Sequence, residues 1–390
     1  MKNVYFDNAA TSWPKPSQMI DAMNRYNETI GGNPGRSGHH LSVEAARIIF
    51  ETRELIAQLF NIDDPFQLIF TRNATEALNQ VIFGMVKNGH HVITSGMEHN
   101  SVMRPLRYLE QHGLKVTVVP CFQDGSIEPR EIEKSICSNT KMIIMTHASN
   151  VTGTIMPVKE VGHIAASHGI PFCVDAAQSA GAIPIDVEDM NISLLAFTGH
   201  KSLYGPQGTG GLYIKKGLEN DLVPRMMGGT GSRSEFEVQP DFMPDRFESG
   251  TPNAMGLAGL GASARFILNR GIDTIRAAEL TLTTMFLDKA GDIPGLRLYG
   301  PRKADLCTPV ISFTIDGISS SGVSQILDEK FSILSRPGLH CAPAAHHSIN
   351  TLPGGTVRFS FGHFNRTDEI IYAIDAVKRI ASGTIKGDAV

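Results

Sequence analysis

Four short segments combine chemically competent side chains with the small residues that commonly end strands. In FTGHKSLYGPQGTGG (197–211), Lys201 lies between a predicted strand end and a glycine-rich loop. A lysine forms a Schiff base with an aldehyde only if its amine is kept neutral by partial desolvation. Taken alone, a lysine in such a loop is more often a solvated surface residue. The segment therefore indicates carbonyl chemistry only in company with other groups.

A carboxylate at the end of an apolar strand is the second signal. VDAAQSAG (174–181) places Asp175 where an unpaired charge would be costly. A protonated pyridine nitrogen would be a suitable cation, and the pair would make the ring a strong electron sink. Capping of the next helix explains Asp175 alone equally well. Gln178 could face the same ligand and donate a hydrogen bond to a phenolate oxygen.

The other two segments offer an anion site and an imidazole. TRNATEALNQ (71–80) is a strand-to-helix turn whose free backbone N–H groups favour phosphate, although such helix starts are common. MEHNS (97–101) places His99 at another strand end. A buried histidine that merely satisfies its neighbours is the commoner case. The functional alternative is stacking on a cofactor ring and proton transfer.

The elements that carry these segments predict an α/β fold. Short apolar runs alternate with amphipathic stretches, which is typical of a mostly parallel sheet with helices on both faces. Ligand sites in such sheets lie at the carboxyl ends of the strands. Strands are expected at 67–71, 91–95, 115–120, 141–147, 171–176 and 194–199, and helices at 42–60, 255–271, 272–290 and 368–380.

The regular alternation stops in a segment rich in Gly, Pro, Met and charge at 217–255, which we expect to be a loop. The helices, strand and helix that follow predict a smaller C-terminal α+β domain, onto which the N-terminal strap folds. We assign residues 15–255 to the large domain and residues 1–14 with 256–390 to the small domain.

Composition excludes several classes of protein. The formal net charge is −4 and basic residues are scattered, so neither nucleic acid nor an acidic membrane is an expected partner. We find no apolar run of the roughly 18 residues that span a bilayer and no secretion signal, which predicts a cytoplasmic location. The five cysteines lack a CxxC pair, which argues against a disulfide framework and a metal site.

The ordered set of motifs resembles the class V aminotransferase family of fold-type I pyridoxal-phosphate enzymes. The matching stretches are FDNAAT, TRNATEALN, MEHNS, HASNVTG, VDAAQ, TGHK, ESGTPN and VRFSFGHFN, and they cover nearly the whole chain. The resemblance implies a large domain with a mostly parallel seven-stranded sheet, a smaller C-terminal domain, and pyridoxal 5′-phosphate as the cofactor.

The same resemblance implies a role for each matching residue. Lys201 would carry the cofactor covalently and Asp175 would pair with its pyridine nitrogen. The remaining implied cofactor contacts are Gln178 at the phenolate oxygen, His99 over the ring, Ala74, Thr75, Thr198 and His200 at the phosphate, and Asn150 near cofactor and substrate. Arg358 would bind the substrate carboxylate through its bidentate fork. Thr251 would reach the phosphate of a neighbouring subunit, which implies a homodimer with shared active sites.

One loop distinguishes members of the family. SRPGLHCAPAAHH (335–347) resembles the R-x-G-x-H-C-A loop of cysteine desulfurases and selenocysteine lyases with a short catalytic loop. It is divergent, because Leu339 replaces the first of two histidines and the stretch after the cysteine differs. A free loop cysteine is usually unreactive, but the cationic groups expected near Cys341, such as Arg336, favour the nucleophilic thiolate.

The resemblance thus implies a cysteine desulfurase. L-Cysteine would become L-alanine, with Lys201 moving the Cα proton and the sulfur captured as a persulfide on Cys341. The persulfide would pass to an acceptor protein or a small reductant, and either His99 or His340 would handle thiol protons. The alternatives are a selenocysteine lyase, another lyase or transaminase of the family that does not need Cys341, and a non-catalytic sulfur-trafficking scaffold.

Overall fold

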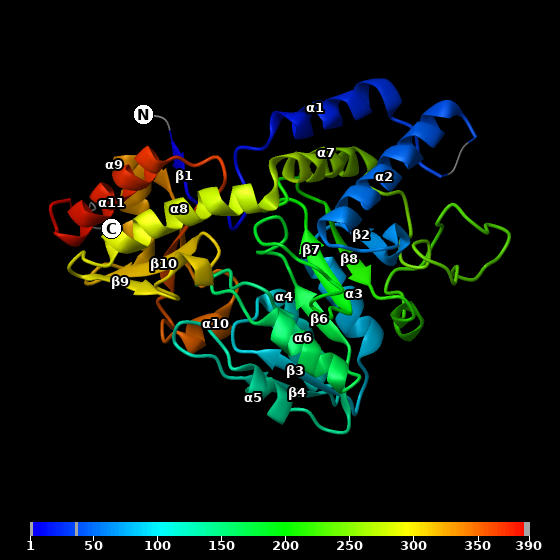
Figure 1. The fold of residues 1–390 in the computed structure, drawn as a ribbon, viewed down its shortest axis with the longest axis horizontal. Coiled ribbons are helices and arrows are strands. Elements are labelled where there is room, and N and C mark those ends of the chain that lie inside the picture. Colours follow the sequence, from blue (N-terminus) through cyan, green and yellow to red (C-terminus); the bar gives the residue numbers. More distant parts are fainter. Residues whose placement is uncertain (1–2, 36–37, 386–390) are drawn as a thin grey trace.

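The computed structural model describes residues 3–35 and 38–385 of the chain (Figure 1). Its largest sheet has seven strands, in the order β2-β8-β7-β6-β5-β3-β4. The strands from β7 to β4 are parallel to one another, whereas β8 is antiparallel to both of its neighbours. The prediction of a mostly parallel seven-stranded sheet is therefore confirmed. The bounds are β2 (Leu68–Thr71), β3 (His91–Ser95), β4 (Lys115–Val119), β5 (Thr140–Thr146), β6 (Phe172–Asp175), β7 (Leu194–Thr198) and β8 (Gly210–Ile214).

Six of these strands were expected from the sequence, and β8 was not. The strand begins with Gly210 and Gly211. Glycine weakens a strand prediction, because it often marks a bend or a place where another backbone approaches closely. A Cβ on Gly211 would lie 2.8 Å from the carbonyl oxygen of Ile69 and 2.4 Å from the ring of Phe197. The glycines are therefore needed where β8 packs closely beside the neighbouring strands.

Helices cover both faces of this sheet. The first helices of the chain are α1 (Ser17–Arg25), which packs on α7 (Ala254–Arg270) rather than on the sheet, α2 (His40–Leu59), α3 (Ala74–Met85), α4 (Asn100–Glu110), α5 (Pro129–Lys134) and α6 (Val158–Ser167). Both α3 and α4 begin directly after a parallel-sheet loop, and side chains cap their first turns: Asn73 accepts from the Glu76 amide and His99 from the Ser101 amide. The two helix starts therefore lie at the edge of the sheet where the strands end.

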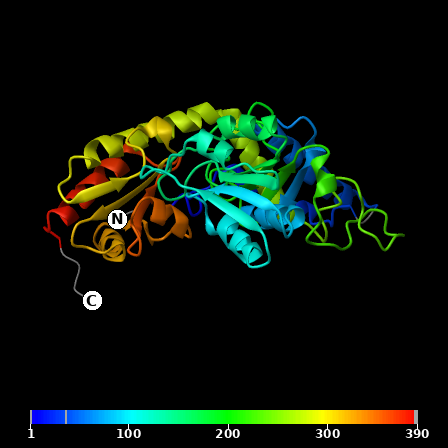
Figure 2. The ribbon, with the colours of Figure 1, turned by 90° about the horizontal axis from the view of Figure 1, so that it is seen from below.

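A second, smaller lobe follows in the chain (Figure 2). Its antiparallel sheet has the order β12-β13-β10-β9, and β1 pairs with β11 beside it. The bounds are β1 (Val4–Tyr5), β9 (Leu296–Tyr299), β10 (Val310–Ile315), β11 (Ile333–Leu334), β12 (Arg336–Gly338), β13 (Thr356–Ser360), α8 (Ile272–Ala290), α9 (Ser320–Phe331), α10 (Pro343–Ser348) and α11 (Thr367–Ala381). Val4 and Phe6 belong to the core of this lobe, whereas Thr11 and Ser12 donate hydrogen bonds to the carbonyls of His200 and Lys201 in the large lobe. The assignment of residues 1–14 to the small domain stays a prediction. Residues 1–2 and 386–390 of the predicted small domain lie outside the described residues.

The helix α7 (Ala254–Arg270) packs on the large lobe, and α8 continues from it to the small lobe (Figure 1). The buried Leu257, Leu260 and Ile267 of α7 share the core of the large sheet, whereas Phe286 of α8 lies in the core of the small lobe. The domain boundary at residue 255 stays a prediction. Among the described residues, no helix combines the length and the apolar character needed to cross a membrane.

Candidate active site

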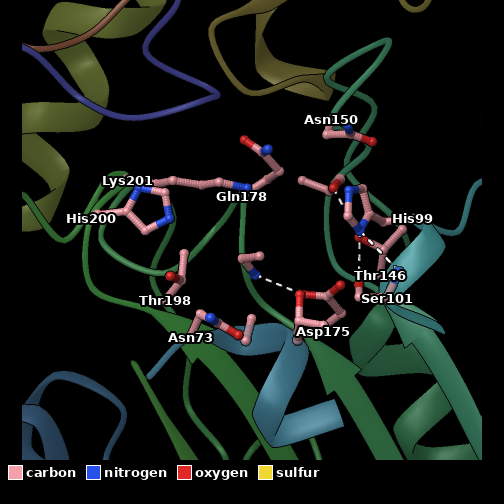
Figure 3. Close-up of a pocket in the computed structure, with 14 residues that line it drawn as sticks. Asn73, His99, Ser101, Thr146, Asn150, Asp175, Gln178, Thr198, His200 and Lys201 are labelled. Atoms are coloured by element: carbon pink, nitrogen blue, oxygen red, sulfur yellow. Dashed lines mark hydrogen bonds between the residues drawn. The ribbon is translucent and has the colours of Figure 1, made fainter. Parts of the chain in front are cut away.

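A pocket lies where the parallel strands of the large sheet end (Figure 3). It brings together every predicted site residue except Thr251, Cys341 and Arg358. The lining residues are Asn73, Ala74, Thr75, His99, Ser101, Thr146, Ala148, Asn150, Asp175, Ala177, Gln178, Thr198, His200 and Lys201. Lys201 and His200 enter from one side and His99 and Asn150 from the other.

Lys201 follows β7 and presents an amine that is not fully charged near neutral pH. Burial lowers the pKa of Lys201 to about 8. The negative charge of Asp175 raises this pKa, and the positive charge of Arg358 lowers it further. A lysine with this pKa is partly neutral at pH 7 to 8 and can act as a nucleophile or a base. Lys201 is only partly exposed and lines the pocket, which favours the functional interpretation over that of a solvated surface lysine.

Asp175 ends β6 and lines the pocket while only 3% exposed. The amide of Ala177 donates to its Oδ1 at 2.9 Å within a turn, and none of the described residues between β6 and β7 forms a helix, so capping of a next helix does not explain Asp175. Burial raises the pKa of Asp175, while the Ala177 hydrogen bond and the charge of Lys201 oppose that rise. A cation bound in the pocket would stabilise this carboxylate.

The hydrogen bonds of His99 define the tautomer of its imidazole ring. Its Nδ1 accepts from the Ser101 amide at 3.1 Å and lies 2.9 Å from the Ser101 hydroxyl oxygen. Burial lowers the pKa of His99 to about 4, and the charge of Lys201 adds to that shift. The neutral ring therefore carries its hydrogen on Nε2, where it can donate to a group in the pocket.

The opposite end of the pocket is rich in donors. The first amides of α3, at Ala74 and Thr75, have no intrahelical carbonyl acceptor, and a helix N-terminus favours an anion. The Nδ1 of His200 is buried and has no partner among the described residues. The hydroxyl of Thr198 makes only a long 3.5 Å contact, to the carbonyl of Thr209. These groups can receive a phosphate.

Arg358 lies in β13 and is connected to the pocket through Asn150. Its Nη1 donates to the Asn150 carbonyl at 3.0 Å, and its Nη2 forms an ion pair with Asp7 at 2.7 Å. Arg358 is only 1% exposed. We did not predict a role for Asp7, although FDNAAT, in which it stands, was among the recognised motifs.

Cys341 is exposed and lies in the loop between β12 and α10. Its carbonyl accepts from the Asn100 amide at 2.9 Å, beside His99, and Asn150 donates to the preceding His340 carbonyl at 2.7 Å. The Sγ of Cys341 lies 3.7 Å from Nη2 of Arg336. The loop is thus attached to two segments of the pocket wall, with a cation beside the sulfur.

Three of the other cysteines are poorer nucleophiles, whereas Cys137 is exposed like Cys341. Cys173 and Cys307 are buried and Cys121 is partly buried. Burial raises the pKa of Cys121 to about 12 and that of Cys307 to about 11, which disfavours the reactive thiolate. Thr251 is exposed and does not line the pocket of its own chain. Its role stays a prediction.

Comparison with known proteins identifies the family. A family model described as aminotransferase class-V matches residues 4–372, and the chain belongs to this family. It is 35% identical over 384 residues to a "Probable cysteine desulfurase" of Methanothermobacter thermautotrophicus, covering 97% of this chain and 95% of that one.

Solved structures agree. The apo structure of a cysteine desulfurase from Thermococcus onnurineus NA1 matches with a TM-score of 0.91 and 32% identity, covering 98% of this chain and 95% of that one. The cysteine desulfurase CsdA of Escherichia coli matches with a TM-score of 0.87 and 28% identity over 98% of this chain and 95% of that one. The predictions of family and fold type are confirmed.

Family membership implies pyridoxal 5′-phosphate, and the pocket residues fit that cofactor. An aldehyde requires a neutral amine, which Lys201 supplies in part near pH 8. A ring nitrogen requires a buried anion, which Asp175 supplies. The α3 amides and the unpartnered His200 nitrogen fit a phosphate. The pocket thus offers groups that complement three separate parts of the cofactor: its aldehyde, its ring nitrogen and its phosphate.

Proposed function

We propose that the chain is a pyridoxal-phosphate-dependent cysteine desulfurase that takes sulfur from L-cysteine onto Cys341. The observation that carries the proposal is the attachment of an exposed cysteine, with Arg336 beside it, to the wall of the Lys201–Asp175 pocket. A lyase or transaminase that did not use Cys341 would have no need of this attachment.

The chain's own residues divide the work. The bound cofactor supplies an electron sink for the charge that develops at Cα of the substrate. Asp175 holds a positive charge on the ring nitrogen, and Lys201, neutral in part near pH 8, takes and returns the Cα proton. Arg358, already oriented by Asp7 and Asn150, attracts the substrate carboxylate.

Sulfur transfer is a displacement at the substrate sulfur. The Cys341 thiolate forms the S–S bond while the substrate Cβ–S bond breaks. The electron pair of that bond takes up a proton from solvent and becomes a C–H bond of alanine. The enzyme keeps a persulfide, whose terminal sulfur needs an acceptor thiol on a protein or a small reductant. Arg336 stabilises the anionic sulfur before transfer.

Two finer proposals accompany this function. A homodimer with shared sites is supported by Thr251, which is exposed in its own chain, and by the exposed Met227, Phe236 and Val238 in the preceding loop. Selenocysteine is the alternative substrate, because its selenium would take the place of the sulfur and its Cβ–Se bond would break in the same way. The cytoplasmic location stays a prediction.

The decisive experiment replaces Cys341 by Ala. The C341A protein should keep the cofactor absorbance and lose alanine formation from cysteine by at least about a hundredfold, because no thiolate accepts the sulfur. Alanine, sulfide and the persulfide-bearing peptide are measured with a reductant present. Cys137→Ala, which removes another exposed cysteine, is the control. Undiminished alanine output from C341A would contradict the proposal, and a faster turnover of selenocysteine with negligible cysteine turnover would favour the lyase.

A further inference from the structure

The loop that carries Cys341 has an unfavourable backbone. His340 and Cys341 are consecutive non-glycine residues with φ of +51° and +58°. Each such residue costs about 1–2 kcal/mol, so surrounding contacts must hold the loop. Asn150 and Asn100 bind the two carbonyls from the pocket side. These bonds leave the side chain of His340 to be fixed by something else.

Three buried side chains form a hydrogen-bonded row behind the loop. Nε2 of His340 lies 3.0 Å from the Arg336 carbonyl oxygen, and its Nδ1 lies 3.3 Å from Nε2 of His346. Nδ1 of His346 lies 2.6 Å from the Thr351 hydroxyl oxygen. His340, His346 and Thr351 are 3%, 0% and 8% exposed, and the two imidazole rings are stacked with centroids 5.5 Å apart. We call these three residues the histidine row.

The Arg336 carbonyl oxygen, at one end of the histidine row, sets the direction of every hydrogen bond in the row. A carbonyl oxygen only accepts, so Nε2 of His340 must carry the hydrogen and its Nδ1 must accept. Nε2 of His346 therefore donates, and its Nδ1 accepts from the Thr351 hydroxyl. Burial lowers the pKa of both histidines, to about 3 for His340 and about 4 for His346, which agrees with a neutral row.

Both ring nitrogens of His340 are thus engaged, and neither has a lone pair for a thiol proton. We propose that His346 is a positioning residue for sulfur transfer: through His340 it holds Cys341 in its left-handed conformation beside Arg336. The inference rests on the proposed role of Cys341. It also leaves His99, whose Nε2 hydrogen is not used by the Ser101 contact, as the histidine that serves proton transfer in the pocket.

The test separates hydrogen bonding from ring packing. His346→Phe keeps a planar ring and removes both bonds, whereas His346→Gln keeps one donor and one acceptor on one side chain. His347, the exposed neighbour on α10, supplies the matched controls His347→Phe and His347→Gln. All variants are loaded with cofactor, and folding is checked by thermal unfolding.

Two readouts are measured: kcat and KM for cysteine, and the rate at which iodoacetamide alkylates Cys341, followed by mass spectrometry. We expect H346F to lower kcat about ten- to a hundredfold with KM nearly unchanged, because the cofactor pocket is built from other elements. Alkylation should slow, since the sulfur moves away from Arg336. H346Q should recover most of both values, and the His347 variants should match the unmodified protein.

Specific results would overturn the proposal. A folded H346F protein with unchanged kcat and alkylation rate would do so, as would H346Q being as impaired as H346F, because ring packing alone would then explain the effect. If H346F does not fold, Thr351→Val decides: it removes the donor to His346, and an unchanged alkylation rate would reject the histidine row. Absence of alanine from the unmodified protein would instead reject the desulfurase function, and the alkylation comparison would still test the row.

Discussion

Burial controls the charges of the site residues one by one. Lys201 and His99 have lowered pKa values, and Asp175 has a raised one, each chiefly because burial disfavours the ionised form. Attraction between Lys201 and Asp175 opposes this effect for both members of the pair. The amine is consequently near the point where small changes in its surroundings shift its protonation.

This balance gives a pH prediction for Lys201. In protein freed of cofactor, the neutral fraction of a lysine with pKa about 8 rises as the pH increases through 8. Asp175→Asn removes the charge that raises this pKa, so the midpoint of Lys201 reactivity should move below that of the unmodified protein. Reductive methylation of Lys201, read by mass spectrometry from pH 6 to about 10, measures the midpoint. Asp21→Asn, on an exposed face of α1, should leave it in place; a shift to higher pH in D175N would contradict the explanation.

At the scale of elements, the site depends on where parallel strands end. The ends of β6 and β7 supply Asp175 and the Lys201 turn, and α3 and α4 start at the same edge. The exposed segment that carries Thr251 has no strand to position it. It is attached instead by Glu248, which receives hydrogen bonds from Arg53 of α2 at 2.9 Å and from the Phe70 amide at 2.6 Å.

Removing Arg53 should release this segment. The Arg53 side chain is 4% exposed and that of Glu248 21%, so Arg53→Met leaves a poorly solvated carboxylate and should destabilise the protein by about 2–4 kcal/mol. Limited proteolysis should then cut faster between residues 222 and 253. Arg72→Met breaks a pair whose arginine is 72% exposed and should cost less than about 1 kcal/mol. Equal cleavage of the two variants would show that the Arg53–Glu248 pair does not hold the segment.

For the molecule as a whole, the site joins distant parts of the chain. Asp7 of the N-terminal strap pairs with Arg358 of β13, and the Cys341 loop of the small lobe binds the start of α4 in the large one. Relative movement of the two lobes would therefore separate the sulfur acceptor from the lysine. The proposed dimer adds a further participant, because Thr251 would complete the site of the partner.

Mixed dimers test that participation. Lys201→Ala inactivates its own site, whereas Thr251→Glu should weaken phosphate binding in the partner's site by charge repulsion. Each variant alone should be inactive or nearly so. Co-expressed, they should form mixed dimers in which one site has both an intact lysine and an intact threonine, so activity should return. Alanine formation by dimers purified through two different tags measures this. No recovery, with dimers formed, would mean that Thr251 does not serve the neighbouring site.

The sequence by itself indicated the family, through its ordered motifs. It also predicted six of the seven strands of the large sheet and most pocket residues, because strand ends and helix starts with small or polar residues are local patterns. Asp175 and Lys201 stood out as local signals, but their roles were implied only by the resemblance of the ordered motifs to the family. Only the tertiary structure revealed β8, whose glycines are required by contacts with Ile69 and Phe197. The same holds for Asp7 and His346: their partners lie on other segments or behind a turned loop, and a hydrogen bond between buried side chains leaves no periodic signal in the chain.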